Sequence, residues 1–312
     1  ITTGMFYVGG DTWAVRFTGT RPGTWELKTT SADKDLDGRR SAVMVEARAG
    51  NGFLTAEGRD WVFSGNGKAF LPQYVMAPSV DRLNEAAIDD LIATFIGEHG
   101  FSGFHLSMQC RWFDMTESSC ADVGTPNPDQ ETFERLELLI RKTHAAGGAV
   151  HLWMWGDSQR DQNPARWGLN GKVDQRMQRY IAARLGPLPG WTMGYGYDLF
   201  EWVTAAQLDT WHRFMQTEMG WPHLLGARGA TNELTQISEN LDYTSYEYWQ
   251  PSPSIYRQMV ERRPNKPVFA EDRYRIYPAN STHAYKSYTS ETTRRGLWHA
   301  AWRAVSRTSG GM

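Results

Sequence analysis

Hydrophobic and polar residues follow two different patterns along the chain, and the change falls near residue 60. Before it, apolar and polar residues alternate in short runs such as FYVGG, TWAVRFTG and GTWELKTT, with glycine and proline between the runs. A period of two predicts strands that bury one face. We therefore expect residues 1–55 to form a small immunoglobulin-like β-sandwich domain. Because such a sandwich needs about seven strands and only about four fit here, we expect further strands upstream of Ile1.

From residue 56 onward, strand-like apolar runs alternate with segments of helical periodicity. The predicted strands are residues 69–75, 101–108, 149–155, 191–196, 222–227, 241–249 and 267–272. Apolar residues three and four positions apart predict helices around 88–95 and 133–144, and a capping box at Thr204 and Gln207 predicts the start of another. This alternation predicts parallel strands joined by crossover helices.

The strand count favours an α/β fold of the (β/α)8 TIM barrel type over residues 56–312. An open doubly wound sheet is disfavoured because no glycine-rich phosphate loop follows the first strand. A last helix is predicted from about Ser290 through Val305, and the sequence SGGM then stands where the eighth strand should begin. We therefore expect the barrel to be incomplete at this end of the chain as well.

Composition narrows the possible partners. The formal net charge is −2, without a basic cluster, which disfavours nucleic acid and anionic membranes as partners. No apolar run approaches the roughly 20 residues that span a bilayer. The chain holds 14 Trp and 13 Tyr residues, whose flat faces suit sugar rings as well as protein cores, so composition leans weakly towards carbohydrate.

Two cysteines and one acidic run are the features of the sequence that suggest a disulfide or a metal site. Cys110 and Cys120, ten residues apart in a loop-like stretch, suit a local disulfide in a secreted or periplasmic protein, and two free thiols in a cytoplasmic protein are the alternative. The acidic run DKDLDG resembles a calcium loop, but Met44 stands where a bidentate Glu is required. We expect neither a metal nor another cofactor.

Acidic residues follow two of the predicted strands. In a barrel of this kind the active site lies at the carboxyl ends of the strands. Glu271 ends the seventh predicted strand, and Asp198 and Glu201 follow the fourth. Strands four and seven face each other across a barrel, so carboxylates there can flank one bound molecule, as retaining glycoside hydrolysis requires. The alternative is that Glu271 forms an ion pair, for example with Arg273, and only closes the rim.

The chain also resembles a known arrangement of domains. The run MFYVGGDTWAVRFTGTRPGTWELKTTSADKDLDG resembles the latter part of a β-sandwich domain of unknown function that precedes glycosidase-like barrels in bacterial polysaccharide-degrading enzymes. The run GNGKAFLPQYVMAP resembles the linking hairpin and first strand of those barrels, and the rest is similar to clan A glycoside hydrolases of the apiosidase-like and putative endoglucanase kind. This resemblance covers almost the whole chain.

The resemblance implies roles for the acidic residues. Clan A enzymes are retaining, with a Glu nucleophile at the end of strand seven, which Glu271 matches. Their Glu acid/base follows strand four, often after Asn, whereas Phe200 stands at that place here. The acid/base is therefore Glu201 or Asp198, and Glu201 is preferred because its side chain reaches further.

Further residues are candidates for substrate binding. Tyr246, in competition with Tyr243, matches the strand-six Tyr that donates to the nucleophile in the clan. Trp155, near the end of strand three, is the preferred stacking ring. The other candidates for contacts with sugar lie on strands two, three and six: His105, Gln109, Arg111, His151, Trp153, Glu247 and Trp249. For each of them, ordinary barrel packing or a rim salt bridge is an equally good explanation.

The leading hypothesis is a retaining glycoside hydrolase that acts on a polysaccharide or oligosaccharide without a cofactor. A carbohydrate-binding protein on a hydrolase scaffold is the first alternative, supported by the missing Asn. An interaction module of a larger secreted assembly is the second. The sequence does not indicate the sugar, the linkage or the oligomeric state.

Overall fold

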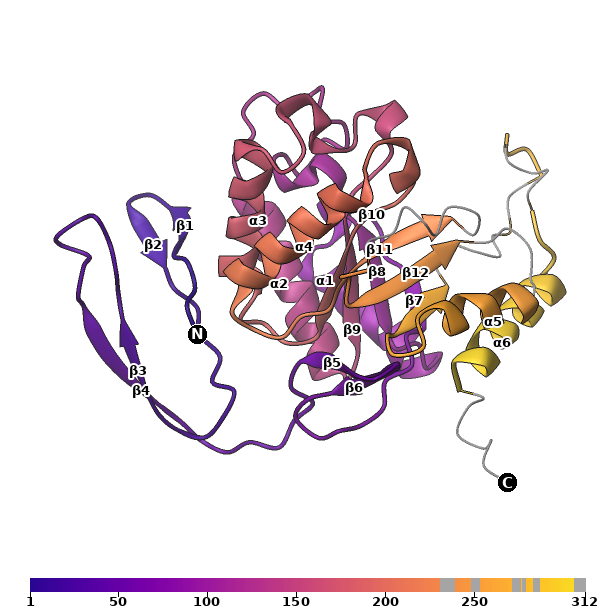
Figure 1. The fold of residues 1–312 in the computed structure, drawn as a ribbon, viewed down its shortest axis with the longest axis horizontal. Coiled ribbons are helices and arrows are strands. Elements are labelled where there is room, and N and C mark those ends of the chain that lie inside the picture. The colour runs from indigo at the N-terminus through magenta and orange to yellow at the C-terminus, as the bar shows by residue number, and fades with distance from the viewer. Residues whose placement is uncertain (231–238, 248–252, 271–275, 277–278, 283–286, 306–312) are drawn as a thin grey trace.

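A parallel sheet forms the centre of the molecule (Figure 1). The computed structural model describes residues 1–312 except 231–238, 248–252, 271–275, 277–278, 283–286 and 306–312. Seven parallel strands follow one another in chain order: β7 (Tyr74–Met76), β8 (Gly103–Ser107), β9 (Ala149–Trp155), β10 (Trp191–Gly196), β11 (Leu225–Ala230), β12 (Tyr243–Glu247) and β13 (Val268–Ala270). Strands β7 and β13 are the two edges of this sheet in the described residues, so no closed barrel is seen there.

Helices connect most of the strands, as the alternating pattern predicted. They are α1 (Glu85–Leu91), which continues as a π-helix (Ile92–Glu98), α2 (Gln130–Ala145), α3 (Lys172–Leu185), α4 (Ala205–Met219), α5 (Pro253–Arg262) and α6 (Ser290–Val305). Helices α2, α3 and α4 lie together on one side of the sheet (Figure 1). Helices α5 and α6 pack against each other, and α6 also contacts β13 at the edge of the sheet. None of the helices in the described ranges is both long and apolar enough to cross a membrane.

Local sequence explains the positions of these elements. Every residue of β9 and β10 is buried, as expected for strands covered on both faces. The predicted capping box is present: the Thr204 hydroxyl accepts from the Gln207 backbone N–H, and the Gln207 side chain accepts from the Thr204 backbone N–H. Helix α6 begins at Ser290, where the sequence predicted it. The prediction of an α/β fold with parallel strands and crossover helices is therefore confirmed.

The first predicted strand was placed too early. Residues 69–75 were expected to form it, but β7 begins at Tyr74. The preceding residues join a hairpin of β5 (Leu54–Glu57) and β6 (Asp60–Phe63), where Ala69 bridges Val62. Apolar residues of this hairpin region pack in one cluster with the first residues of β9 and β12: Leu54, Trp61, Phe63, Phe70, Ala149 and Tyr243. The apolar run AFLPQYV thus contributes to two elements, which periodicity alone does not separate.

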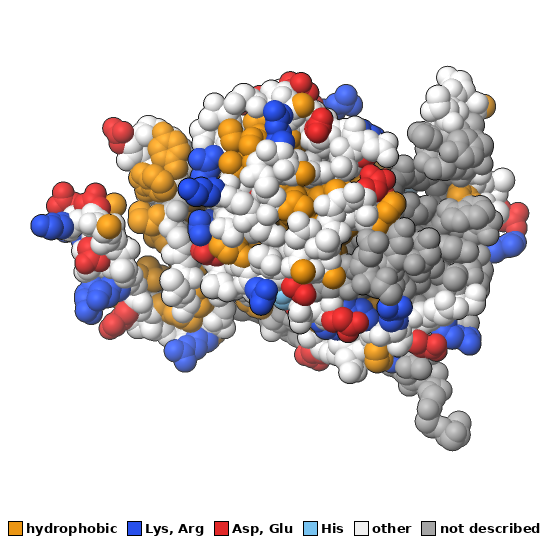
Figure 2. Space-filling view, turned by 45° about the horizontal axis from the view of Figure 1, so that its top comes forward, with side chains coloured by type: hydrophobic (Ala, Val, Ile, Leu, Met, Phe, Trp, Pro, Cys, Tyr) orange, Lys and Arg blue, Asp and Glu red, His pale blue; other side chains and the backbone are white. Residues whose placement is uncertain are grey.

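Residues before β5 form two separate hairpins. One pairs β1 (Phe6–Gly9) with β2 (Thr12–Ala14), and the other pairs β3 (Gly23–Lys28) with β4 (Arg40–Val45). Among the described residues, no sheet before β7 has more than two strands, so the strands were predicted correctly but the sandwich is not seen. Figure 2 shows hydrophobic side chains gathered at this end of the molecule, where Trp13 is 58% exposed and Met44 is 68% exposed.

The N-terminal segment nevertheless contacts the helices of the sheet region. The Arg16 guanidinium lies 2.8 Å from the Glu137 carboxylate of α2. The Thr18 hydroxyl donates to the Pro187 carbonyl at 2.6 Å, and the Trp221 indole N–H donates to the Thr18 carbonyl at 2.9 Å. These contacts fix the segment around residues 16–18 against the ends of α3 and α4.

Candidate active site

The carboxyl ends of the parallel strands meet at one edge of the sheet, and polar side chains gather there. In an α/β sheet of this kind, that edge is where ligands bind. Five residues near it contact one another: Gln109 after β8, Trp153 in β9, Tyr197 and Asp198 after β10, and Arg228 in β11. We refer to these five residues as the strand-end cluster.

Arg228 and Asp198 form an ion pair within this cluster. The Arg228 Nη2 atom lies 3.0 Å from Asp198 Oδ1, and the side chains are 3% and 33% exposed, respectively. The Arg228 guanidinium also lies over two aromatic rings, 4.8 Å from the centre of Trp153 and 5.4 Å from that of Tyr197. A buried cation needs such compensation because it has lost its hydration.

Tyr197 is held on its other side by two amide side chains. The Gln109 Nε2 atom donates to the Tyr197 hydroxyl at 2.8 Å, and that hydroxyl donates to Gln162 Oε1 at 2.7 Å. Burial raises the pKa of Tyr197, so the hydroxyl keeps its proton at neutral pH. The turn after β10 is thereby connected to the loops after β8 and β9.

Two residues of the cluster have a left-handed backbone. Gln109 has a φ of 59° and Asp198 has a φ of 51°, and each stands shortly after the end of its strand. Residues other than glycine adopt this conformation at a cost, and they keep it where surrounding contacts determine it. Here the Gln109 and Asp198 side chains both make hydrogen bonds within the cluster.

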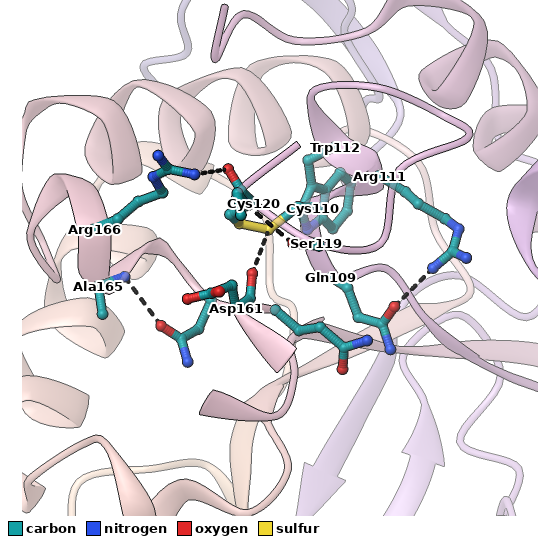
Figure 3. The surroundings of a disulfide bond; sticks show 12 residues. Gln109, Cys110, Arg111, Trp112, Ser119, Cys120, Asp161, Ala165 and Arg166 are labelled. Carbon is teal, nitrogen blue, oxygen red and sulfur yellow. Dashed lines mark hydrogen bonds between the residues drawn. A yellow bond between two sulfur atoms is a disulfide. The ribbon is translucent and has the colours of Figure 1, made fainter. Parts of the chain in front are cut away.

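The disulfide lies next to Gln109 and Arg111 (Figure 3). The structure joins Cys110 to Cys120, with Cα atoms 5.2 Å apart. The Cys120 backbone N–H donates to the Asp161 carbonyl at 2.6 Å, so the loop after β8 is also attached to the loop after β9. This crosslink restricts the segment that carries Gln109.

The three carboxylates predicted to carry catalysis are placed unequally. Asp198 belongs to the strand-end cluster, and its carbonyl accepts from the Glu201 backbone N–H at 3.1 Å. Glu201 ends a short 3-10 helix (Leu199–Glu201), and its side chain is exposed. Glu271 lies outside the described residues, so the separation of the carboxylates stays a prediction.

Strand six carries candidates of which only the backbone is described. Tyr246 and Glu247 belong to β12, and Tyr246 lies opposite Gly229 of β11 and Ala270 of β13. Their side chains lie outside the description, as does all of Trp249. The competing residue Tyr243 is fully buried at the start of β12, where its ring packs against Trp61.

The two histidine candidates lie inside the sheet rather than at its edge. His105 is 7% exposed and His151 is fully buried. Their Nδ1 atoms are 2.6 Å apart, and His151 Nε2 is 2.7 Å from the Tyr243 hydroxyl. Burial lowers the pKa of both, that of His151 to about 3, so both are neutral at neutral pH. Packing between strands accounts for these two residues, and their expected contact with sugar hydroxyls receives no support.

Trp155 and Arg111 differ in how well the structure suits them to binding. Trp155 has no exposed surface, and its ring stacks on Phe113 with the ring centres 6.1 Å apart. In this structure it therefore presents no face to a ligand, contrary to the stacking role expected from the sequence. Arg111 Nη1 donates to Gln109 Oε1 at 2.7 Å, and its side chain is 17% exposed. Arg111 therefore lies beside the strand-end cluster.

Sequence reasoning missed Arg228, Tyr197 and Gln162. An Arg within the apolar run PHLLGARGA was a usable signal, because a cation inside a buried strand needs a partner. Tyr197 directly precedes the predicted Asp198. Gln162 lies in the polar loop DQNP, where no pattern distinguishes it. Among the described residues, no group of three His, Cys, Asp or Glu side chains could hold a metal ion.

Comparison with known proteins supports the fold. The sequence matches no protein-family model and no curated protein sequence. A Bacteroides vulgatus structure, provisionally described as a glycoside hydrolase, superposes with a TM-score of 0.77 at 16% identity, covering 96% of this chain and 62% of that one. A family 5 glycoside hydrolase of the same organism gives 0.56 at 15% identity, covering 81% of this chain and 60% of the other.

A third similar structure is the catalytic domain of a Thermobifida fusca endoglucanase. Its TM-score is 0.55 at 12% identity, with 81% of this chain and 83% of that chain covered. At such identities the likeness establishes a shared fold; two of the three proteins are described as glycoside hydrolases and the third as an endoglucanase. The chain spans less than two thirds of the length of the two Bacteroides proteins.

Proposed function

We propose that this protein is a retaining glycoside hydrolase on a (β/α)8 barrel that follows an immunoglobulin-like domain. The observation that carries the proposal is the position of Asp198, in the strand-end cluster, and of Glu201, three residues later, after the fourth parallel strand of a fold shared with glycoside hydrolases. Acidic residues at this edge are the usual catalysts of such sheets. The disulfide between Cys110 and Cys120 agrees with a secreted or periplasmic location.

The proposed reaction is a double displacement. The Glu271 carboxylate attacks the anomeric carbon while an acid protonates the departing glycosidic oxygen, which gives a covalent glycosyl-enzyme. The same acid, now a carboxylate, takes a proton from water, and the hydroxide attacks the anomeric carbon and releases Glu271. Glu201 is the proposed acid/base because its side chain is exposed and longer, and Asp198 is the alternative.

A polysaccharide or oligosaccharide is the proposed substrate. The proteins of similar fold include an endo-1,4-β-mannanase from Rhizomucor miehei and the Thermobifida endoglucanase, one form of which was solved with cellotetraose. We therefore suggest cello- and manno-oligosaccharides as the first compounds to test.

A carbohydrate-binding protein without catalysis is the second candidate function. Phe200 supports it, because this residue stands where clan A enzymes often carry Asn and is 44% exposed. An Asn side chain can donate and accept hydrogen bonds, whereas an exposed Phe ring offers stacking but no hydrogen bond. Sugar release separates the two candidates.

The test removes each proposed carboxylate and follows product. Glu271→Ala should lower kcat by several orders of magnitude on every substrate, because the nucleophile is lost. Glu201→Ala should keep the first step on an activated aryl glycoside and accumulate the intermediate, so that added azide restores turnover and gives a glycosyl azide of retained configuration.

Circular dichroism must first show that both variants are folded. Azide rescue of Asp198→Ala, but not of Glu201→Ala, would move the acid/base role to Asp198. Folded variants with full activity would exclude the assigned site, and binding of oligosaccharide without any release of sugar would favour the second candidate.

A further inference from the structure

Arg228 differs from an ordinary surface arginine in its burial and in its surroundings. Its side chain is 3% exposed, and it lies in a parallel strand rather than in a loop. The Asp198 carboxylate and the faces of Trp153 and Tyr197 compensate its charge. Loss of Arg228 would remove the guanidinium that Asp198 contacts, and loss of Asp198 would remove a compensating charge from a buried cation, so each side chain affects the placement of the other.

Exposure distinguishes the two members of the pair. Asp198 is 33% exposed, about ten times the exposed fraction of Arg228, so a bound molecule at the strand ends can contact the carboxylate but hardly the guanidinium. Arg228 can therefore influence a ligand through Asp198. Arg228 is therefore placed to orient the Asp198 carboxylate, and the carboxylate is placed to contact a ligand.

The turn that carries Asp198 is held from several directions. Gln109 and Gln162 fix the Tyr197 hydroxyl from the loops after β8 and β9, and Arg228 fixes Asp198 from β11. These contacts can hold Asp198 in its left-handed backbone conformation. The orientation of the carboxylate is thus set by residues that are far apart in the sequence.

We propose that Arg228 positions the Asp198 carboxylate for contact with the bound sugar, an inference that rests on the proposed function. A planar guanidinium is suited to this role because it can stack on two rings while one of its N–H groups donates to the carboxylate. Lysine can supply the charge but not the planar stacking, so it should replace arginine only in part.

The test is a double-mutant cycle with Arg228→Met, Asp198→Asn and the combined variant, together with Arg228→Lys. The probes are cellotetraose and mannotetraose, with binding measured by calorimetry and kcat and KM measured by sugar release. We expect each single variant to lose at least about tenfold in binding or in kcat/KM, the combined variant to lose no more than the larger single loss, and Arg228→Lys to lie between.

Arg184 provides a matched control. It is a second buried arginine, with a side chain that is 4% exposed, an ion pair with Glu137 of α2, and the rings of Phe6 and Phe133 at 5.5 Å, but it belongs to the last turn of α3, away from the carboxyl ends of the strands. Arg184→Met should lower the thermal midpoint as Arg228→Met does, while binding and kcat/KM per folded molecule stay at the wild-type values.

The following outcomes decide between the possibilities. Wild-type kinetics and binding in folded Arg228→Met would contradict the proposal, as would losses that multiply in the combined variant. An equal loss of binding in Arg184→Met would show a general effect of destabilisation. A wild-type protein that neither binds nor cleaves either probe would contradict this inference for cello- and manno-oligosaccharides without excluding a glycoside hydrolase that acts on another sugar. Binding without cleavage would contradict the hydrolase but still test the inference by calorimetry.

Discussion

Asp174 shows what a single buried carboxylate does to this protein. It lies in the first turn of α3 with no exposed surface, and its Oδ2 atom accepts from the Asn170 backbone N–H at 2.8 Å and from the Tyr195 hydroxyl at 3.4 Å. Burial raises its pKa to about 6, although hydrogen bonds from Gln178 and other neighbours act in the opposite direction. Desolvation therefore outweighs the hydrogen bonds at this site.

This shifted pKa predicts a pH-dependent stability. Between the unfolded value of 3.8 and the folded value of about 6, the folded state binds more protons, so the contribution of Asp174 to the free energy of unfolding falls as pH rises. The fall amounts to about 3 kcal/mol at most. Asp174→Asn should remove this fall. The free energy of unfolding of the variant, relative to that of the wild type, should therefore rise from pH 4 to pH 7, as measured by urea unfolding.

The comparison between variant and wild type is necessary because buried histidines act in the opposite direction. Burial lowers the pKa of His151 to about 3, so the unfolded state binds more protons from about pH 3 to 6.5 and stability rises with pH over that range. Only the difference between the two proteins isolates Asp174. A constant difference from pH 4 to pH 7 would contradict the prediction.

At the scale of elements, the β5–β6 hairpin closes the lower end of the sheet. Trp61 of β6 is 5% exposed, and its ring centre lies 5.1 Å from that of Tyr243 at the start of β12. Leu54 and Phe63 complete the same cluster. The hairpin therefore buries apolar surface that the seven-stranded sheet would otherwise expose, and it stabilises the sheet without any backbone pairing to it in the described residues.

Trp61→Ala should lower the free energy of unfolding by about 3–5 kcal/mol, because a large buried ring is lost and a cavity remains. Trp13→Ala is the matched control, since Trp13 is 58% exposed on β2 and its loss should change stability by no more than about 0.5 kcal/mol. Chemical denaturation of both variants provides the measurement. Equal losses would mean that the β1–β2 hairpin contributes as much as the β5–β6 hairpin.

At the scale of the whole molecule, the N-terminal hairpins are attached to the sheet region through few contacts. Arg16, Thr18 and Tyr7 reach α2, α3 and the residues beyond them, whereas β3 and β4 are mostly exposed. Phe6, which is 3% exposed, adds an apolar contact with Tyr180 of α3, but the contact is small and resembles an interface between domains more than a shared core. The parallel sheet should therefore fold without it.

A chain that begins at residue 51 should keep the β5–β6 hairpin and the parallel sheet, and it should fold with a thermal midpoint a few degrees lower, because the ion pair of Arg16 and the hydrogen bonds of Thr18 are lost. Its circular dichroism and thermal unfolding test this. A shortened chain without cooperative unfolding would show that the N-terminal segment belongs to the core.

The sequence alone determined the order and kind of most elements. Apolar runs such as AVHLWMW and WTMGYG form buried strands because their residues leave no polar face, and the helix after Thr204 begins where its capping box predicts. Short spacing indicated the pairing of Cys110 with Cys120, which the structure also contains. These features depend on neighbours in the sequence, so they can be read from it.

Only the tertiary structure decided how the candidate site is arranged. Strand position made His105, His151 and Trp155 candidates for contact with sugar and Asp198 a candidate catalyst; burial places the first three inside the protein and leaves Asp198 at the strand ends. The partner of Asp198 is 30 residues away on the next strand, and Tyr197 is held by Gln109, 88 residues away. Contacts of that separation depend on strand register and on which helix covers which face, and local patterns contain neither.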